Sequence, residues 1–233
     1  DPTSVESNVE IGAVFDGYAS SAPYTSLIDW GDGAITAGQV QEAAGSGAIA
    51  ASHTYANPGV YSVRVTLTDT FGVTSETTHE YVVVYDAQGG FVTGGGWIVS
   101  PAGAYTPAPT VSGKASFGFV SKYEHGANTP TGNTQFNFKA AGLNFQSTSY
   151  YWLVVAGKKA QFKGTGTING QGDYEFMLTA IDGQISGGGG ADKLRIKIWD
   201  RQTGGLVYDN QMQAADTSDP TTVIGGGSIV IHR

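Results

Sequence analysis

Two aspartates in the stretch SLIDWGDGAITAG, residues 26–38, are the most conspicuous candidates for chemistry in this chain. Asp29 and Asp32 flank a tryptophan and lie among glycines. This spacing could serve a carboxylate pair in acid–base catalysis, a cation site, or a tight turn whose amides the side chains cap. Catalysis would require a cleft and carboxylates whose surroundings separate their pKa values, and the sequence gives no sign of these. Gly31 and Gly33 favour the turn, because glycine reaches backbone conformations closed to other residues.

Other reactive groups are few or badly spaced for catalysis. The chain has no cysteine, and its histidines, His53, His79, His125 and His232, are dispersed without zinc-binding spacing. No G-x-S-x-G nucleophile motif occurs, and the serine of GGGSIV begins a strand instead of a strand-to-helix turn. We therefore expect a protein that is not an enzyme.

Composition predicts an all-β protein. Of the 233 residues only 14% are charged, whereas 35 are glycine and Val, Thr, Tyr and Phe recur throughout, which is typical of short strands joined by glycine turns. No apolar run approaches the roughly 20 residues of a membrane-spanning helix, so we expect no membrane insertion.

Charge is distributed unevenly along the chain. Residues 1–86 contain eleven acidic residues against Arg64 alone, a net charge of −10, and the remainder has eleven basic against nine acidic residues, a net charge of +2. An acidic half repels phosphate, which argues against nucleic-acid binding. The asymmetry indicates either a solvated acidic surface, cation binding, or attraction between copies of the chain.

Residues 1–86 show the pattern of a small sandwich. In VYSVRVTLTD, residues 60–69, apolar Tyr61, Val63, Val65 and Leu67 alternate with polar residues, which predicts a strand with one buried face. Turn signals such as NPG precede it, and HEYVVVY, VEIGAVF and SLIDW are further short strands. This spacing favours an immunoglobulin-like sandwich over 1–86, with a linker at 87–90.

Residues 91–233 continue as strands without a helix. GKASFGFVSKYE, TQFNFKA, YYWLVVAG, AQFKGTGTI, DYEFMLTAI, DKLRIKIWD and GGGSIVIHR are separated by hairpin signals such as Asn169-Gly170. We expect a larger antiparallel β-sandwich or flattened barrel. The glycine runs at 94–96, 187–190 and 225–227 lack a following helix that could bind phosphate, and are interpreted as turns and bulges.

The motifs of the first part resemble the PKD family of immunoglobulin-like domains. IDWGDG at 28–33, followed by HTYANPGVYSVRVTLTD at 53–69, is similar to that family's W-D-F-G-D-G-like turn, H-x-Y, Pro-Gly turn and V-x-V-x-D strand. Ile28 and Trp30 replace the usual Trp and Phe, while both aspartates remain. The stretch from GGFVTGGGWIVSPAG to IGGGSIVIHR resembles the conserved C-terminal region that follows such repeats in large secreted and surface proteins of bacteria.

The resemblance implies a calcium site as the alternative to a plain turn. In some PKD domains the first aspartate of the turn and the aspartate that ends the V-x-V-x-D strand help to bind calcium, and these correspond to Asp29 and Asp69. Oxygen ligands suit Ca²⁺. The linker ligands of that site have no recognisable match among Asp1, Glu6 and Asn8.

Two binding surfaces are expected in the second part. DKLRIKIWD places Leu194, Ile196 and Ile198 toward the core and Lys193, Arg195 and Lys197 toward solvent, which predicts a basic stripe for an acidic protein surface, such as the first domain of another copy, or simply a soluble face. The aromatic residues Trp97, Tyr150, Trp152 and Trp199 could stack on sugar rings or pack in the core. Asp182, Asp192, Asp200 and Asp209, at strand ends, could cap turns or form a second oxygen site.

These observations predict a non-catalytic structural or adhesive module, extracellular or on the surface of bacterial cells. Its expected partners are other copies of itself or surface proteins. Head-to-tail charge pairing, or addition of the terminal strand 228–233 to a neighbour's sheet, would assemble copies into filaments. The alternative is a carbohydrate-binding part of a secreted hydrolase.

Overall fold

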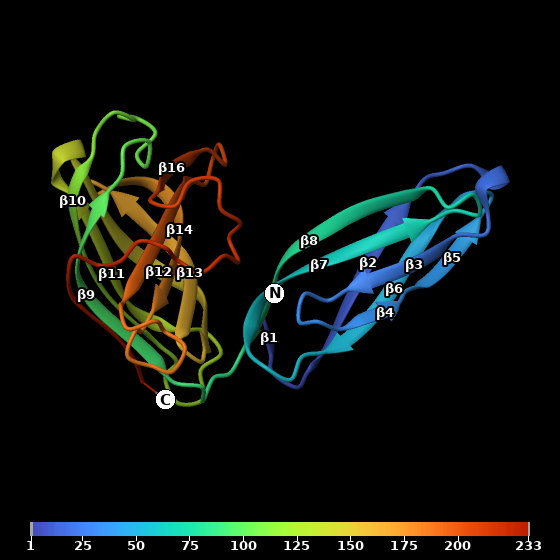
Figure 1. The fold of residues 1–233 in the computed structure, drawn as a ribbon, viewed down its shortest axis with the longest axis horizontal. Coiled ribbons are helices and arrows are strands. Elements are labelled where there is room, and N and C mark those ends of the chain that lie inside the picture. The colour runs from blue at the N-terminus through green and yellow to red at the C-terminus, as the bar shows by residue number, and fades with distance from the viewer. Residues whose placement is uncertain (1, 233) are drawn as a thin grey trace. The chain divides into compact units, whose positions relative to one another are not determined.

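The computed structural model describes residues 2–232 and confirms the all-β prediction (Figure 1). The chain divides into two compact units, and the boundary lies between Val84 and Tyr85. We call residues up to Val84 unit 1 and residues from Tyr85 onward unit 2. No helix of the described residues has both the length and the apolar character needed to cross a membrane.

Unit 1 is a sandwich of two β-sheets. Its strands are β1 (Thr3–Ser4), β2 (Asn8–Phe15), β3 (Thr25–Asp29), β4 (Ile35–Ala37), β5 (Gln39–Ala43), β6 (Ser46–Thr54), β7 (Gly59–Thr68) and β8 (Thr74–Tyr85), with a short 3-10 helix η1 (Ala19–Ser21) after β2. One sheet has the order β1-β8-β7-β3-β4 and the other the order β2-β6-β5. A five-stranded sheet thus packs against a three-stranded sheet, as in an immunoglobulin-like sandwich whose two sheets differ in size.

The core of unit 1 follows the alternation seen in the sequence. Val63 and Val65 of β7 are buried, whereas Arg64 between them is on the outer face. Trp30 and Tyr55 are fully buried beside them. Burying large aromatic side chains removes much apolar surface from water and therefore stabilises the domain.

Unit 2 is one nine-stranded antiparallel sheet that curls around a single core (Figure 1). Its strands are β9 (Phe91–Ser100), β10 (Gly113–Lys122), β11 (Thr131–Phe138), β12 (Leu143–Ala156), β13 (Lys159–Ile168), β14 (Gln171–Ile181), β15 (Lys193–Asp200), β16 (Leu206–Asp209) and β17 (Gly226–His232), with a 3-10 helix η2 (Lys139–Ala141). Their order is β16-β15-β14-β13-β12-β11-β10-β9-β17. The last strand therefore pairs with the first strand of the unit, and the two edges of the sheet are β16 and β17.

Two of the three glycine runs lie wholly or mostly in strands that pair without a register shift, so their interpretation as turns and bulges is wrong. Gly94–Gly96 belong to β9, and Gly226 and Gly227 belong to its partner β17. A Cβ on Gly96 would stand 2.0 Å from the Gly226 carbonyl oxygen, and one on Gly94 would stand 2.3 Å from the Phe119 ring. Close approach of two backbones, and of a backbone to a ring, therefore requires these glycines. The run at 187–190 lies between β14 and β15, as expected of a turn.

Candidate functional site

The Asp29–Asp32 turn is a structural centre of unit 1. The Gly31 N–H donates to Asp29 Oδ1 at 3.1 Å, and the Ala34 N–H donates to Asp32 Oδ1 at 3.0 Å. Gly31 has a φ of 78°, and a Cβ there would lie 2.7 Å from the Ser62 carbonyl oxygen. Both carboxylates therefore cap turn amides, and glycine is needed for the turn to close.

Aromatic rings and His53 enclose this turn. The Trp30 ring stacks on His53 with centroids 5.0 Å apart, and the Tyr55 hydroxyl donates to the Trp30 carbonyl oxygen at 2.9 Å. His53 Nε2 lies 2.8 Å from Asp32 Oδ2. The residues of the expected H-x-Y motif thus contact the W-G-D-G turn from the opposite sheet. They can do so because His53 is near the end of β6, close to the end of β3.

The environment of the turn shifts two pKa values. Partial burial works to raise the pKa of Asp32, but the hydrogen bond from His53 and the Ala34 amide outweigh it and lower that pKa. Burial, together with the negative charge of Asp32, raises the pKa of the Tyr55 hydroxyl. Asp32 is therefore an anion and Tyr55 a neutral donor near neutral pH.

Asp29 and Asp69, from which one calcium site is predicted, lie at opposite ends of the paired strands β3 and β7, too far apart to bind one cation between them. In the β3–β7 register Asp29 lies opposite Arg64, and its Oδ2 is 3.3 Å from the Arg64 guanidinium. Asp69 is five residues farther along β7, about 16 Å at roughly 3.3 Å per residue. Its Oδ1 accepts the N–H groups of Phe71 and Val73, each at 2.9 Å. Among residues 2–232, no group of three or more metal-binding side chains occurs.

The expected basic stripe of unit 2 is also corrected. Arg195 is only 2% exposed, because the loop after β16 covers this face of β15. Its guanidinium forms a two-pronged pair with Asp209, with Nε–Oδ1 at 3.0 Å and Nη2–Oδ2 at 2.8 Å. Lys197 Nζ lies 2.7 Å from Asp216 Oδ1 of the same loop. The alternation placed these side chains on the face away from the main core, as predicted, but that face is not free.

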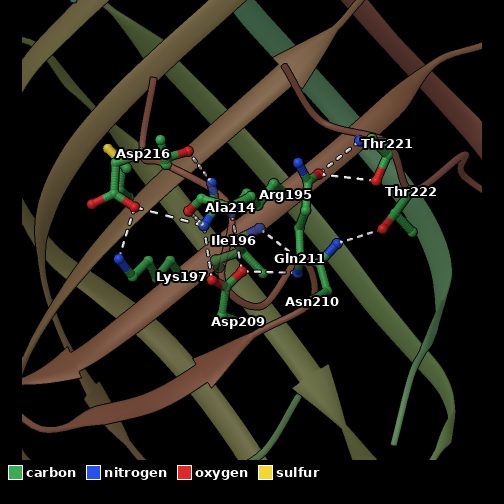
Figure 2. A network of polar contacts seen from close by, with 12 residues as sticks. Arg195, Ile196, Lys197, Asp209, Asn210, Gln211, Ala214, Asp216, Thr221 and Thr222 are labelled. Carbon is green, nitrogen blue, oxygen red and sulfur yellow. Dashed lines mark hydrogen bonds and ion pairs between the residues drawn. The ribbon is translucent and has the colours of Figure 1, made fainter. Parts of the chain in front are cut away.

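Figure 2 shows how this network holds the loop after β16 against the sheet. Arg195 also donates to the carbonyl oxygens of Ala214 and Ala215, at 2.9 and 2.8 Å. Asn210 accepts the Ile196 N–H at 2.8 Å and donates to Thr222 Oγ1 at 2.9 Å. The network satisfies buried charges with several donors and acceptors, which is the condition under which an ion pair is tolerated inside a protein.

The partners in this network are not predictable from local sequence patterns. Asp216 and Thr222 come from a segment without strand pattern, so nothing local indicates that they lie over β15. The sequence does contain one signal, an arginine that alternates with apolar residues in DKLRIKIWD, followed by Asp209 and Asn210 at the end of the next strand. That signal did not distinguish a solvent face from a loop-covered one.

The four expected stacking residues do not form one platform. Tyr150 and Trp152 are 6% and 5% exposed, and the Tyr150 hydroxyl is 2.7 Å from Thr134 Oγ1 in the interior. The prediction that these two serve a sugar surface is therefore wrong, because burial removes them from solvent. Trp97 and Trp199 are partly exposed.

Both partly exposed tryptophans have neighbouring cations. Lys114 Nζ is 4.6 Å from the Trp97 ring centroid, and Lys197 Nζ is 4.8 Å from the Trp199 centroid. Gly225 packs closely on the six-membered ring of Trp97. The cation–π contacts stabilise the rings where they lie and reduce the ring surface open to a sugar.

The free edge of β17 is capped by side chains. The Ile229 N–H donates to Asp192 Oδ2 at 2.7 Å, and the Ile231 N–H donates to Asp182 Oδ2 at 3.1 Å. The second oxygen of Asp192 accepts the Gly183 N–H at 2.8 Å. The expected addition of strand 228–233 to a neighbour, a range whose Arg233 lies outside the described residues, would have to displace these caps. Capping by carboxylates is a way to protect an edge strand.

The aspartates at strand ends therefore act as caps. Asp200 Oδ1 accepts the N–H groups of Gln202 and Thr203, each at 2.9 Å, and the amide of Thr203 is the main cause of its lowered pKa. Asp209 accepts the Gln211 N–H besides its pairing with Arg195. The turn-capping alternative is the one that the geometry supports.

Comparison with known protein families gives a match for unit 1. Residues 4–84 match the family model described as PKD domain. The match confirms the resemblance for unit 1, ends where unit 1 ends, and leaves the resemblance of unit 2 a prediction. No curated protein matches the chain.

Proposed function

We propose that this chain is a non-catalytic structural and adhesive module that acts outside the cell. The observation that supports the proposal is the PKD match over 4–84, since PKD domains are generally non-catalytic modules and are typical of extracellular proteins. The acidic residues singled out from the sequence fit this role, because Asp29, Asp32 and Asp69 cap turns. Surface proteins are the proposed partners.

The two filament routes expected from the sequence are not retained in their original form. Head-to-tail pairing needs an exposed Arg195, which is buried, and strand addition at β17 meets the Asp182 and Asp192 caps. Adhesion to a different molecule is therefore the form of the function that we propose. Filament assembly by this chain would require another surface.

Adhesion is tested with beads. Beads coated with the folded chain should be retained on the producing cells, or on immobilised matrix proteins, under flow. In the Arg195→Ala variant the buried Asp209 loses its partner, which destabilises unit 2. Comparing beads coated with this variant and with the wild-type chain tests whether retention depends on a folded unit 2. Retention no greater than that of uncoated beads on every surface would refute the proposal.

Carbohydrate binding is the second candidate, and the partial exposure of Trp199 is the observation in its favour. Insoluble polysaccharide should then pull the chain from solution, Trp199→Ala should abolish retention, and Trp199→Phe should preserve it, because a phenyl ring still stacks on a sugar. Equal retention of all three chains would eliminate Trp199 as a sugar contact.

A further inference from the structure

One side of the unit 1 sandwich, where the smaller sheet ends at β2, has no strand within residues 2–232 to cover the end of the larger sheet. The smaller sheet ends at β2, which pairs only with β6 among the described residues. Opposite it, β8 extends over Thr74–Tyr85, and its residues 74–80 are exposed. The larger sheet therefore overhangs the smaller one, and an additional strand beside β2 would fill the place that faces β8.

A groove runs along this open side. Two adjoining hollows of about 210 and 180 Å³ share Phe15, Asp16, Leu67 and Ser75 in their walls. Val14 is 87% exposed and Val73 is 67% exposed along the same groove. Exposed apolar side chains that gather around a groove mark an interaction site more often than single scattered ones do.

The β2 edge of unit 1 differs from the β17 edge of unit 2 in whether side chains cap its outward N–H groups. On β17 the outward N–H groups of Ile229 and Ile231 are capped by aspartates. On β2 no strand lies on the outer side in the part of the chain that the structure describes. An uncapped strand edge beside an apolar groove provides both requirements of strand addition, namely main-chain hydrogen bonds for affinity and pockets for alternate side chains.

Charge defines the chemistry of the occupant. Asp16, Asp69 and Glu76 line the groove, and neither hollow has a lysine or arginine in its wall. The first 84 residues contain ten acidic residues and one basic residue, Arg64, whose guanidinium pairs with Asp29 and lies 4.0 Å from Glu76 Oε2. Asp16 and Asp69 are therefore the groove carboxylates that form no ion pair with another described residue. Such a surface attracts cationic segments and repels acidic ones.

We propose that the groove between β2 and β8 binds an extended cationic peptide segment of another protein by strand addition to β2. Alternate side chains of the segment, small and apolar, face Phe15 and Leu67, and the Lys or Arg side chains between them face the carboxylates at the rim. The proposal names the partner class for the adhesive function above and rests on it. Its test uses purified components, so failure here leaves the result of the bead experiment intact.

The test measures binding of a fluorescein-labelled peptide of eight alternating lysine and valine residues to the full chain by fluorescence anisotropy. Two peptides serve as controls. One has glutamate in place of lysine, and the other is methylated on alternate backbone nitrogens, which removes main-chain donors. We expect the lysine peptide alone to bind, with amide chemical-shift changes confined to residues 8–16 and 74–80.

Matched variants locate the site. Val14→Lys places a cation on the outer face of β2, on the strand that the segment would pair with, and should weaken binding of a cationic segment at least tenfold, which is about 1.4 kcal/mol. Val99→Lys makes the same change at an exposed valine of unit 2 and should leave binding unchanged. Both positions are exposed, so neither variant should unfold the chain.

Four results would overturn the proposal. They are the absence of binding at millimolar peptide, equal binding of the methylated or the glutamate peptide, an equal effect of Val14→Lys and Val99→Lys, and shift changes that map outside the groove. A chain that dimerises at rising concentration and loses the dimer in Val14→Lys would instead assign the groove to a second copy.

Discussion

At the scale of single residues, the carboxylates that could have done chemistry hold backbone in place. Asp32 uses one oxygen for the Ala34 N–H and the other for His53. Because His53 also stacks on Trp30, the Asp32–His53 hydrogen bond and the buried indole stabilise one another. A short polar motif thus fixes where the two sheets of unit 1 meet.

The lowered pKa of Asp32 gives a pH dependence of stability. A carboxyl whose pKa is lower in the folded state contributes stability above its unfolded value, about 3.8, and this contribution is lost as pH falls through the lower folded value. Asp32→Asn keeps the shape and removes the charge, so we expect it to cost about 1 kcal/mol at pH 7 and less at pH 3. Urea unfolding at pH 7, 5 and 3, followed by amide NMR signals of unit 1, measures this. An equal cost at all three pH values would contradict it.

Arg195 provides a sharper stability prediction. Arg195→Ala leaves the buried Asp209 without its partner, and breaking a buried pair from one side costs about 3–5 kcal/mol. Unfolding in urea, followed by the fluorescence of the unit 2 tryptophans, measures the loss. Lys122→Ala removes a cation from an exposed pair with Glu124 and should change stability by less than about 1 kcal/mol. Similar small effects of both variants would contradict the role of the network.

The sequence predicted residue roles well where partners are close along the chain. The turn caps at Asp29 and Asp32 bond to residues only two positions away, so local spacing was sufficient. Arg195 depends on carbonyl oxygens about twenty positions away in a loop without periodicity. The alternation of apolar and polar residues along a strand predicts on which face of the sheet a side chain lies. It does not predict whether a loop covers that face.

At the scale of elements, β17 shows how the free edge of a curled sheet is protected. Asp182 follows β14 and Asp192 precedes β15, so the glycine-rich connection between these strands brings both carboxylates to β17. The glycine runs in β9 and β17 were misinterpreted from the sequence because close backbone approach between two strands leaves no local pattern that distinguishes it from a turn.

Removing one cap should release the edge. Asp192→Ala exposes the Ile229 N–H, and we expect concentration-dependent association of this variant through pairing of β17 edges. Asp192→Asn keeps one acceptor oxygen for the Ile229 N–H and gives up the hydrogen bond from Gly183, so it should remain monomeric. Light scattering after size exclusion, between about 10 µM and 1 mM protein, distinguishes the two, and a monomeric alanine variant would show that the cap is dispensable.

The geometry of β3 and β7 predicts the response of unit 1 to calcium. Asp29 and Asp69 lie at opposite ends of this strand pair, so no cation bound by both can add to stability. We expect the melting temperature of the chain to be the same in millimolar calcium and in chelator, and Asp29→Ala to lower it equally in both. A rise of several degrees in calcium that Asp29→Ala abolishes would restore the site.

At the scale of the whole molecule, the order of strands and turns predicted two all-β parts. Hairpin signals at short intervals indicate antiparallel neighbours, and seven of the eight neighbouring pairs in unit 2 are consecutive strands, against three of six in unit 1. The pairing of β17 with β9 joins segments more than a hundred residues apart, and hairpin signals carry no information about such a contact. The open groove of unit 1 was missed for the same reason, since it depends on which strands remain unpaired.

The last prediction concerns self-assembly of the whole chain. Charge pairing between copies would need the acidic unit 1 to meet an accessible basic strip, but Arg195 is buried and Lys197 pairs with Asp216. Strand addition at β17 would need a free edge, and two aspartates occupy it. We therefore expect the wild-type chain to sediment as a monomer at both 50 and 500 mM salt. Lys193→Glu should leave the sedimentation coefficient unchanged. Filaments that dissolve in high salt would show that copies associate by charge pairing. Filaments that persist in high salt and are lost on deletion of residues 228–233 would show that β17 adds to a neighbour's sheet despite the Asp182 and Asp192 caps.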